Sequence, residues 1–392
     1  RAAAWYEQAA DWPEAVHHAL ATRDDDRAAG LIERAILTIA TWSRANVAIM
    51  QRWLESLPHD TLQSRPWLRL FTSRMLHISG QPKLAGQILE SLEEWLEARP
   101  TCPDADRILG LAMVDRASYA AALGQVRLAQ ELTRRTLARV PQDDPIARFR
   151  APAILGMAHS RAGEVSEAHR AFTEASEIAL RAGLNFAAVP FLCNLADVEI
   201  AQGRLRRALQ TCKQAGELAV LDGAPVAVSG FVGLELSKIL YEWNDLPGAE
   251  QQLVDGLELL RHGGISESFG SGYALLAQIR QARGDREGAR AAAAQAVELA
   301  QREHFPRLAG LTAAYQARVW LAQGQLDLAS RWADEYRRVG ETEYLREFEE
   351  LTLVRVLLAQ GQAAEALALL DARLLSASTA CRMDAVIEAQ AL

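Results

Sequence analysis

Polar and charged side chains recur in this sequence at one fixed place before a repeated glycine (Asn244 in one copy), and their types suit the binding of a polar molecule. Six residues before the successive copies of that marker from Gly124 onward lie Ser118, Met157, Asp197, Lys238, Gln278, Arg318 and Arg355. Tyr241 follows Lys238 by one helical turn. Such groups can hydrogen-bond a polar effector while the aromatic ring stacks on it. We predict a ligand-binding set of Asp197, Lys238, Tyr241, Gln278 and Arg318; the alternative is a row of solvated residues along an open channel.

No residue pattern in the sequence predicts catalysis. The motifs G-x-S-x-G and H-E-x-x-H do not occur, so we expect no enzyme activity and no catalytic residue. The four cysteines are far apart and none belongs to a C-x-x-C pair, so neither a zinc site nor a disulfide framework is indicated. His17 and His18 are adjacent, whereas paired metal ligands on a helix are spaced by three or four residues. We expect this chain to hold no metal and no cofactor.

Two short clusters have both a structural and a functional interpretation. Asp24-Asp25-Asp26 is typical of a helix cap in a solvated turn. The alternative is a metal site, but calcium loops place ligands at alternating positions and add a distal Glu. Gly263-Gly264 and Gly270-Ser271-Gly272 could present backbone N–H groups to a phosphate. No lysine accompanies these glycines, so we predict a loop that joins two hairpins.

The charge of the chain argues against two classes of partner. The formal net charge is −8 and the sequence contains no dense run of Lys and Arg. Proteins that bind nucleic acid carry a basic patch that neutralises phosphates, so we expect no direct nucleic-acid binding by this chain. An apolar run of about eighteen residues, long enough for a membrane span, is also absent. We therefore expect no association with a membrane.

A repeated phrase, a glycine followed five residues later by an alanine, positions the predicted binding residues. It begins at Gly80, Gly124, Gly163, Gly203, Gly284, Gly324 and Gly361, with Asn244 in place of Gly in one copy. Successive copies are 37 to 44 residues apart. A period of this size predicts stacked copies of one small structural unit.

Each unit is predicted to be a helical hairpin. The glycine suits a turn with positive φ at the end of one helix, and apolar residues recur at three- and four-residue steps on both sides of it. Ala168 and Ala208 should lie buried where two helices cross, so a large residue there would overpack the hairpin by roughly 1–3 kcal/mol. We predict an all-α, right-handed superhelix of about nine or ten hairpins with a period of about 40 residues.

The first part of the chain differs from the repeats. We predict a helical lead-in segment over residues 1–60 and the superhelical domain over residues 61–392. In the lead-in, Trp5 to Leu20 should form one amphipathic helix and Ala28 to Ile39 a second. Because the sequence begins at Arg1 without Met and shows no signal-peptide pattern, we expect it to be a piece of a longer cytoplasmic protein.

The spacing of small residues resembles the tetratricopeptide repeat. Small residues precede the glycine by seven positions at Gly156, Ala196, Ala277 and Ala317, and follow the alanine by seven at Ala175, Ala215 and Ala296. The opening is similar to the MalT-like family of large ATP-binding, LuxR-type transcription activators. The matching phrases are Arg1-Ala-Ala-Ala-Trp-Tyr-Glu-Gln8, Pro13-Glu-Ala-Val-His-His-Ala-Leu20, Trp53-Leu-Glu-Ser-Leu-Pro58 and Arg65-Pro66. The period near forty, instead of thirty-four, implies longer helices or loops.

This resemblance implies a regulatory sensor and oligomerisation domain of a signal-responsive bacterial transcription activator. The inducer would be a small molecule or a regulatory protein, and a homo-oligomer would be one of its assemblies. The phosphate loop G-x-x-x-x-G-K-[ST] and the helix-turn-helix of that family are missing here, so ATP and DNA would bind other parts of the parent protein. The alternative function is a protein-interaction scaffold that holds a peptide or helix in its concave groove.

Overall fold

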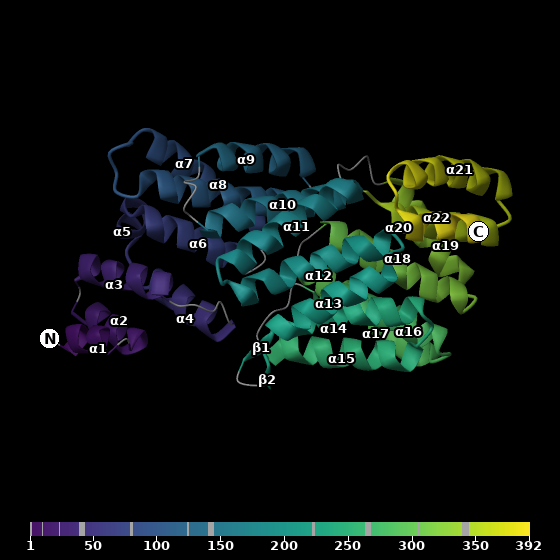
Figure 1. The fold of residues 1–392 in the computed structure, drawn as a ribbon, viewed down its shortest axis with the longest axis horizontal. Coiled ribbons are helices and arrows are strands. Elements are labelled where there is room, and N and C mark those ends of the chain that lie inside the picture. Colours follow the sequence, from purple (N-terminus) through teal and green to yellow (C-terminus); the bar gives the residue numbers. More distant parts are fainter. Residues whose placement is uncertain are drawn as a thin grey trace. The chain divides into compact units, whose positions relative to one another are not determined.

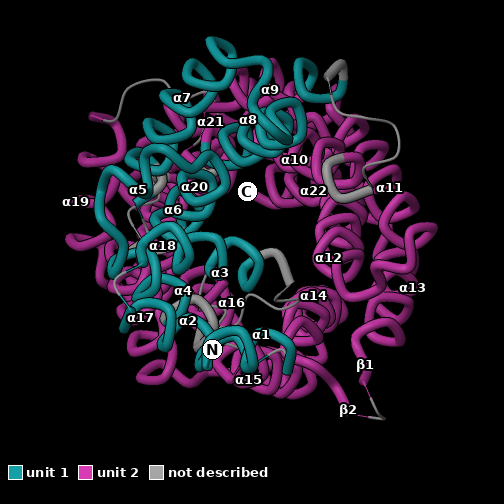
Figure 2. Tube along the Cα trace, turned by 90° about the vertical axis from the view of Figure 1, so that its left-hand side faces the viewer, with its two compact units in different colours: residues 1–119, 134–141 teal, residues 120–133, 142–392 magenta. Residues whose placement is uncertain are grey.

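The structure is a computed structural model that describes residues 2–9, 11–22, 24–38, 44–78, 81–123, 125–139, 145–221, 224–262, 268–303, 306–338 and 345–392. These residues form 22 α-helices and two short strands, which confirms the all-α repeat fold (Figure 1). The chain divides into two compact units (Figure 2). Unit 1 comprises residues 1–119 and 134–141, and unit 2 comprises residues 120–133 and 142–392.

Unit 1 is built from short helices, and its residues 3–75 share a core of Ala, Leu, Ile and aromatic side chains. Trp5 to Leu20 is not one helix: two helices flank residues 9–11, where Asp11 accepts a hydrogen bond from the Glu14 N–H and caps the second of them. Asp24 Oδ1 accepts from the Arg27 N–H at 3.1 Å, as the cap interpretation predicts. The helices are α1 (Ala2–Gln8), α2 (Trp12–Leu20), α3 (Asp25–Thr38), α4 (Arg44–Glu55), α5 (His59–Ser64), α6 (Pro66–Ile78) and α7 (Pro82–Glu97). The next two helices, α8 (Ala105–Ala122) and α9 (Val126–Arg139), contribute residues to both units.

Unit 2 is a series of helical hairpins in which each helix packs on the next. The first helices are α10 (Pro145–Ala162), α12 (Asn185–Ala201), α14 (Ser229–Glu242), α16 (Phe269–Ala282), α18 (Pro306–Ala322) and α20 (Glu347–Ala359). Their partners are α11 (Val165–Arg181), α13 (Leu205–Leu218), α15 (Leu246–His262), α17 (Arg286–Glu303), α19 (Leu326–Arg338) and α21 (Ala363–Thr379), followed by α22 (Met383–Ala391). Helices of 17 or 18 residues at α10, α11 and α12 account for the long period.

The repeated phrase has the predicted structure wherever it is described. The backbone is left-handed at Gly163 (φ 77°) and also at Asn244 (φ 61°), the one copy without glycine. Gly80 and Gly124 lie outside the described residues. Every alanine of the phrase is fully buried, including Ala168 and Ala208 at helix crossings, as predicted. At the described markers, the chain therefore ends the first helix in a left-handed turn, and the small alanine that follows allows the second helix to pack closely against the first.

The glycines near residue 270 pack helices together and do not form the predicted loop. Gly270 and Gly272 are buried in α16, while Gly263 and Gly264 lie outside the described residues. A Cβ at Gly272 would lie 2.7 Å from a methyl group of Leu257, and one at Gly270 would lie 3.0 Å from Leu308. These two glycines are needed because α16 passes close to its neighbours.

The first helices of unit 2 contact one another in order, from α12 through α14, α16 and α18 to α20. We call the surface that they form the first-helix face. The last helix, α22, contacts both α12 and α20, so the end of unit 2 returns to its beginning (Figure 2). The Leu345 N–H also donates to the Arg161 carbonyl at 2.6 Å. Segments more than 180 residues apart in sequence are thereby joined within unit 2.

The strands β1 (Val220–Leu221) and β2 (Ala224–Pro225) form an antiparallel pair between α13 and α14. In the described part of the chain no helix combines the length and apolar character that a membrane crossing requires. Among the same residues no three His, Cys, Asp or Glu side chains are grouped as metal ligands would be.

Candidate functional site

The repeat places the predicted binding residues on successive helices of the first-helix face. Asp197 lies on α12, Lys238 and Tyr241 on α14, Gln278 on α16 and Arg318 on α18. Because neighbouring first helices are in contact, residues of the same phase can meet across them. The structure joins four of the five residues in two pairs, Asp197 with Lys238 and Tyr241 with Gln278.

Lys238 is held by two carboxylates. Its Nζ lies 2.6 Å from Asp197 Oδ1 and 3.0 Å from Glu235 Oε1. Burial opposes the charge of Asp197, but the Lys238 ammonium, with a smaller contribution from Arg307, outweighs burial and lowers the pKa of that carboxyl. Burial likewise opposes the charge of Lys238, and the two carboxylates together raise its pKa. Lys238 is therefore an ion-pair partner within the fold, in addition to its predicted role toward a ligand.

Glu235 predicts a pH-dependent stability. Burial raises its pKa from 4.5 to about 7, and the nearby Lys238 offsets only part of that effect. Protonation of this carboxyl therefore stabilises the fold below pH 4.5, and that contribution is lost as the pH rises to about 7. Replacing Glu235 with Gln should make the chain more stable relative to wild type at pH 8 than at pH 5, by about 1–3 kcal/mol.

Urea unfolding of wild type and Glu235→Gln at several pH values would measure this effect. The exposed Glu258, on α15, provides a control as Glu258→Gln. The other titratable groups near Glu235 are Asp197, Lys238, Cys193 and Cys212. A stability difference between wild type and Glu235→Gln that is the same at both pH values would contradict the prediction.

The remaining predicted residues are also engaged within the protein. Gln278 Nε2 donates to the Tyr241 hydroxyl at 3.0 Å. Arg318 donates from Nε to Thr352 Oγ1 at 2.8 Å, and its guanidinium lies 3.7 Å from the centre of the Phe348 ring. Its Nη2 pairs with Glu388 of α22 at 2.7 Å. The five residues thus form separate bonded groups along the face, and α22 supplies the carboxylate at one end.

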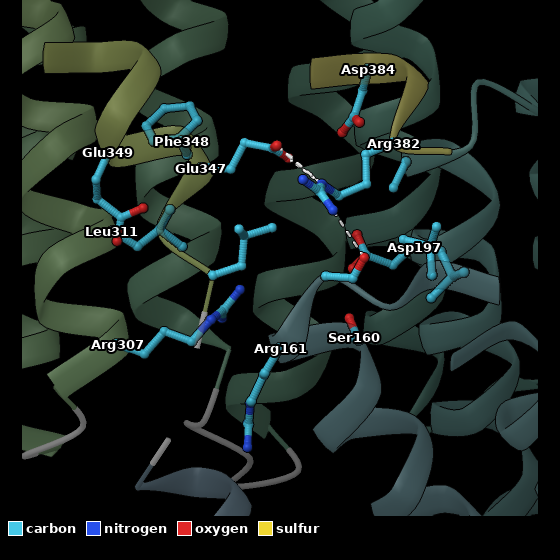
Figure 3. A pocket seen from close by; sticks show the side chains of 15 residues that line it. Ser160, Arg161, Asp197, Arg307, Leu311, Glu347, Phe348, Glu349, Arg382 and Asp384 are labelled. Atoms are coloured by element: carbon cyan, nitrogen blue, oxygen red, sulfur yellow. Dashed lines mark hydrogen bonds and ion pairs between the residues drawn. The ribbon is translucent and has the colours of Figure 1, made fainter. Parts of the chain in front are cut away.

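A cavity of about 180 Å³ adjoins this face, and Asp197 is the one predicted residue on its wall. Charged groups of both signs line it beside a few apolar side chains (Figure 3). The charged lining residues are Arg161, Asp197, Arg307, Glu347, Glu349, Arg382 and Asp384. They come from α10, α12, α18, α20 and the start of α22, so hairpins far apart in sequence share one site.

Arg382 is the most extensively bonded of these side chains. Its Nε donates to both carboxylate oxygens of Glu347 at 3.0 Å, and Nη1 donates to the Gly163 carbonyl at 3.1 Å. Nη2 donates to Ser376 Oγ at 2.9 Å. The arginine is 5% exposed, and it connects the turn before α11 with α20 and α21. It therefore closes one wall of the cavity.

The repeat phase did not predict most of the cavity residues. Arg161 lies two residues before the Gly163 marker, and Arg307 is the second residue of α18. Arg382 precedes α22 and reaches a carbonyl 219 residues away in sequence. The repeat period can only group residues that occupy the same position in neighbouring repeats. This cavity instead brings together helix ends from the first and the last hairpins of unit 2.

These features define a class of protein, an all-α helical-repeat protein with a polar cavity beside the first helices of its hairpins. A family model described as the MalT-like TPR region matches residues 110–392, and the chain belongs to that family. Among curated relatives, the HTH-type transcriptional regulator MalT of Serratia proteamaculans (strain 568) is 28% identical over 369 residues, covering 91% of this chain. The protein of the same name from Yersinia pestis (strain Pestoides F) is 27% identical, covering 90%. The chain spans about 40% of the length of these relatives.

Solved structures share the fold at low sequence identity. A Rap protein complexed with Competence and Sporulation Factor aligns with a TM-score of 0.61 at 13% identity, covering 96% of this chain and 98% of the Rap chain. The Rap conjugation gene regulator of the plasmid pLS20, in complex with the Phr* peptide, has a TM-score of 0.56 at 13% identity and covers 97% of each chain. At this identity the likeness concerns the fold alone.

Proposed function

We propose that this chain is the sensor segment of a signal-responsive transcription regulator in the bacterial cytoplasm. It binds an inducer, a small molecule or a regulatory protein, and relays binding to ATP-binding and DNA-binding modules outside this chain. The observation that carries the proposal is the cavity beside the first-helix face, where three arginines and four carboxylates converge. Membership in the MalT-like TPR family and the transcription regulators among the relatives support the regulatory role.

The relay in this proposal rests on where the cavity walls come from. Arg161 belongs to the first hairpin of unit 2, whereas Glu347 and Arg382 belong to the last helices. A ligand that contacts both groups favours one spacing of these hairpins over another. The equilibrium then shifts by the difference in binding free energy between the two arrangements. Such a shift in the equilibrium requires no chemical reaction. Its consequence would be homo-oligomerisation of the parent protein.

A ligand screen by thermal shift, followed by titration calorimetry of each hit, tests this proposal, because a specific ligand stabilises the fold by mass action. Lys238→Ala and Arg318→Ala should each weaken a ligand bound along the first-helix face about ten-fold or more, through loss of a charge-assisted hydrogen bond. Arg170→Ala, on the exposed face of α11, is the control. The titrations are carried out at a temperature at which each variant is fully folded, because Lys238 also forms ion pairs with Asp197 and Glu235 and its loss could destabilise the fold. A chain that binds neither metabolites nor proteins would contradict the sensor role.

The second candidate is a scaffold that binds a peptide or helix along the first-helix face. The observation in its favour is the shared fold with the two Rap proteins, one of which is described as a complex with a peptide. Its test is a pull-down from the cell extract with a first-helix-face variant as control. A captured protein in the absence of any small-molecule hit would favour the scaffold over the metabolite sensor.

A further inference from the structure

Two arginines that line the cavity have no carboxylate partner among the described residues. Arg161 Nη1 is buried and makes no hydrogen bond there, and neither Arg161 nor Arg307 takes part in an ion pair within the described ranges. Figure 3 draws bonds on Arg382 and none on Arg161 or Arg307. A buried guanidinium nitrogen without an acceptor is costly, since it loses water and gains no partner.

The two guanidiniums are also close enough to affect each other. Burial, followed by the charge of Arg307, lowers the pKa of Arg161 to about 10. The charge of Arg307 also favours the ionised forms of Asp197 and Glu349, but no described carboxylate forms an ion pair with either guanidinium, so the two guanidiniums still repel each other. An anion placed between them would supply the missing acceptors and reverse the sign of this interaction.

The rest of the cavity limits what such an anion can be. Its volume of about 180 Å³ suits a small organic ion and excludes a polymer. Glu347 is already bonded to Arg382, whereas Glu349 lies buried on the same wall, and burial raises the pKa of its carboxyl. Leu311 and Phe348 add apolar surface. A ligand with one oxyanion, a short carbon frame and hydroxyl groups matches this lining.

We propose that Arg161 and Arg307 bind the phosphate or carboxylate group of a small metabolite inside this cavity. The inference rests on the proposed sensor function and names the chemistry of its signal. Planar guanidinium groups match both oxyanions through paired N–H donors. In the ligand-free protein the two positive charges repel each other, and a bound oxyanion removes this unfavourable interaction.

The test uses the whole chain and two probes, inorganic phosphate and malonate, at constant ionic strength set with sodium chloride. Either probe should raise the unfolding temperature in a saturable way, and the tighter of the two identifies the oxyanion. Arg161→Gln and Arg307→Gln should each weaken the binding about ten-fold or more. Arg170→Gln removes the same charge from an exposed site on α11 and should leave the affinity unchanged.

The stability of the ligand-free variants gives a second readout. If Arg161 is an unpaired ligand-binding residue, Arg161→Gln should leave the ligand-free chain as stable as wild type, or more so, while binding falls. A large loss of stability would mean that Arg161 serves the fold, and would overturn the inference. Binding that both Gln variants retain, or no saturable binding of either probe, would overturn it as well.

Carboxylates of the chain itself are the remaining competitor. Residues 341–344 read Glu-Thr-Glu-Tyr and lie outside the described residues. The double variant Glu341→Gln, Glu343→Gln should bind phosphate as wild type does, and phosphate binding by this variant alone would overturn the inference. If a neutral or peptide signal binds and only Arg318→Ala weakens it, the oxyanion inference fails while the sensor function stands.

Discussion

Replacing Arg382 with Ala should destabilise unit 2 by about 3–5 kcal/mol, which is typical when one partner of a buried ion pair is removed. The side chain bonds Glu347, Ser376 and the Gly163 carbonyl, and it is 5% exposed. Its loss leaves the Glu347 carboxylate in the cavity wall without its cation. Urea unfolding measures the cost, and hydrogen exchange should show faster exchange in α22 and in the turn before α11.

A matched control for this experiment is Arg337→Ala. Arg337 also joins two hairpin helices, with Nη2 2.7 Å from Glu365, but both side chains are substantially exposed. Exposed ion pairs contribute about 0–1 kcal/mol, so this variant should remain close to wild type. The double variant Arg382→Met, Glu347→Met should recover part of the loss, because it no longer buries an unpaired carboxylate. Equal, small effects of Arg382→Ala and Arg337→Ala would show that Arg382 does not hold the ends of unit 2 together.

Gly233→Ala should destabilise the α14–α15 hairpin by about 1–3 kcal/mol through overpacking. A Cβ at this position would lie 2.7 Å from the Gln252 carbonyl oxygen and 3.0 Å from the Gly256 Cα. Both are backbone atoms, so no side chain can rotate away to make room. Lys238, Tyr241 and the buried Glu235 follow on the same helix, and a shifted α14 would therefore also disturb the first-helix face.

Gly216→Ala is the matched control for the helix crossing. Gly216 lies in α13, and an added Cβ would approach Val232 only to 3.9 Å, an ordinary contact. Alanine in an open helical position stabilises by about 0.5–1 kcal/mol relative to glycine. Thermal unfolding should therefore move in opposite directions for the two variants. A stabilising Gly233→Ala would show that α14 and α15 cross at a greater distance.

The sequence by itself determined the repeat and its helical hairpins. The left-handed turn needs Gly or Asn at the marker, and the close crossing needs Ala, so both requirements are local and recur with the period. Asn244 shows this directly, because it adopts the same backbone region as the glycines it replaces. The same periodicity placed Asp197 beside Lys238 and Tyr241 beside Gln278. A ligand-binding role for these residues remains a prediction.

Sequence patterns predicted the structure less well where the same pattern fits two different local structures. The apolar spacing from Trp5 to Leu20 is helical throughout, but Asp11 caps a second helix and interrupts it. Gly270 and Gly272 were predicted in a loop because they fall near the junction of two hairpins and no lysine accompanies them, whereas here they let α16 pack against Leu308 and Leu257. Composition alone does not separate a turn glycine from a packing glycine, since both depend on the absence of a side chain.

The existence of the cavity and the residues that line it could be found only from the tertiary structure. Its walls depend on how much each hairpin rotates relative to the previous one, and that small rotation accumulates until α22 meets α12. The rotation is set by the packing of many side chains and has no signature at any single position. Arg161, Arg307 and Arg382 therefore looked like isolated charges at helix ends in the sequence. Their convergence follows from the return of the last helix to the first hairpins of unit 2, as does the contrast between Arg382, which is fully bonded, and the other two, which form no ion pair with a described residue.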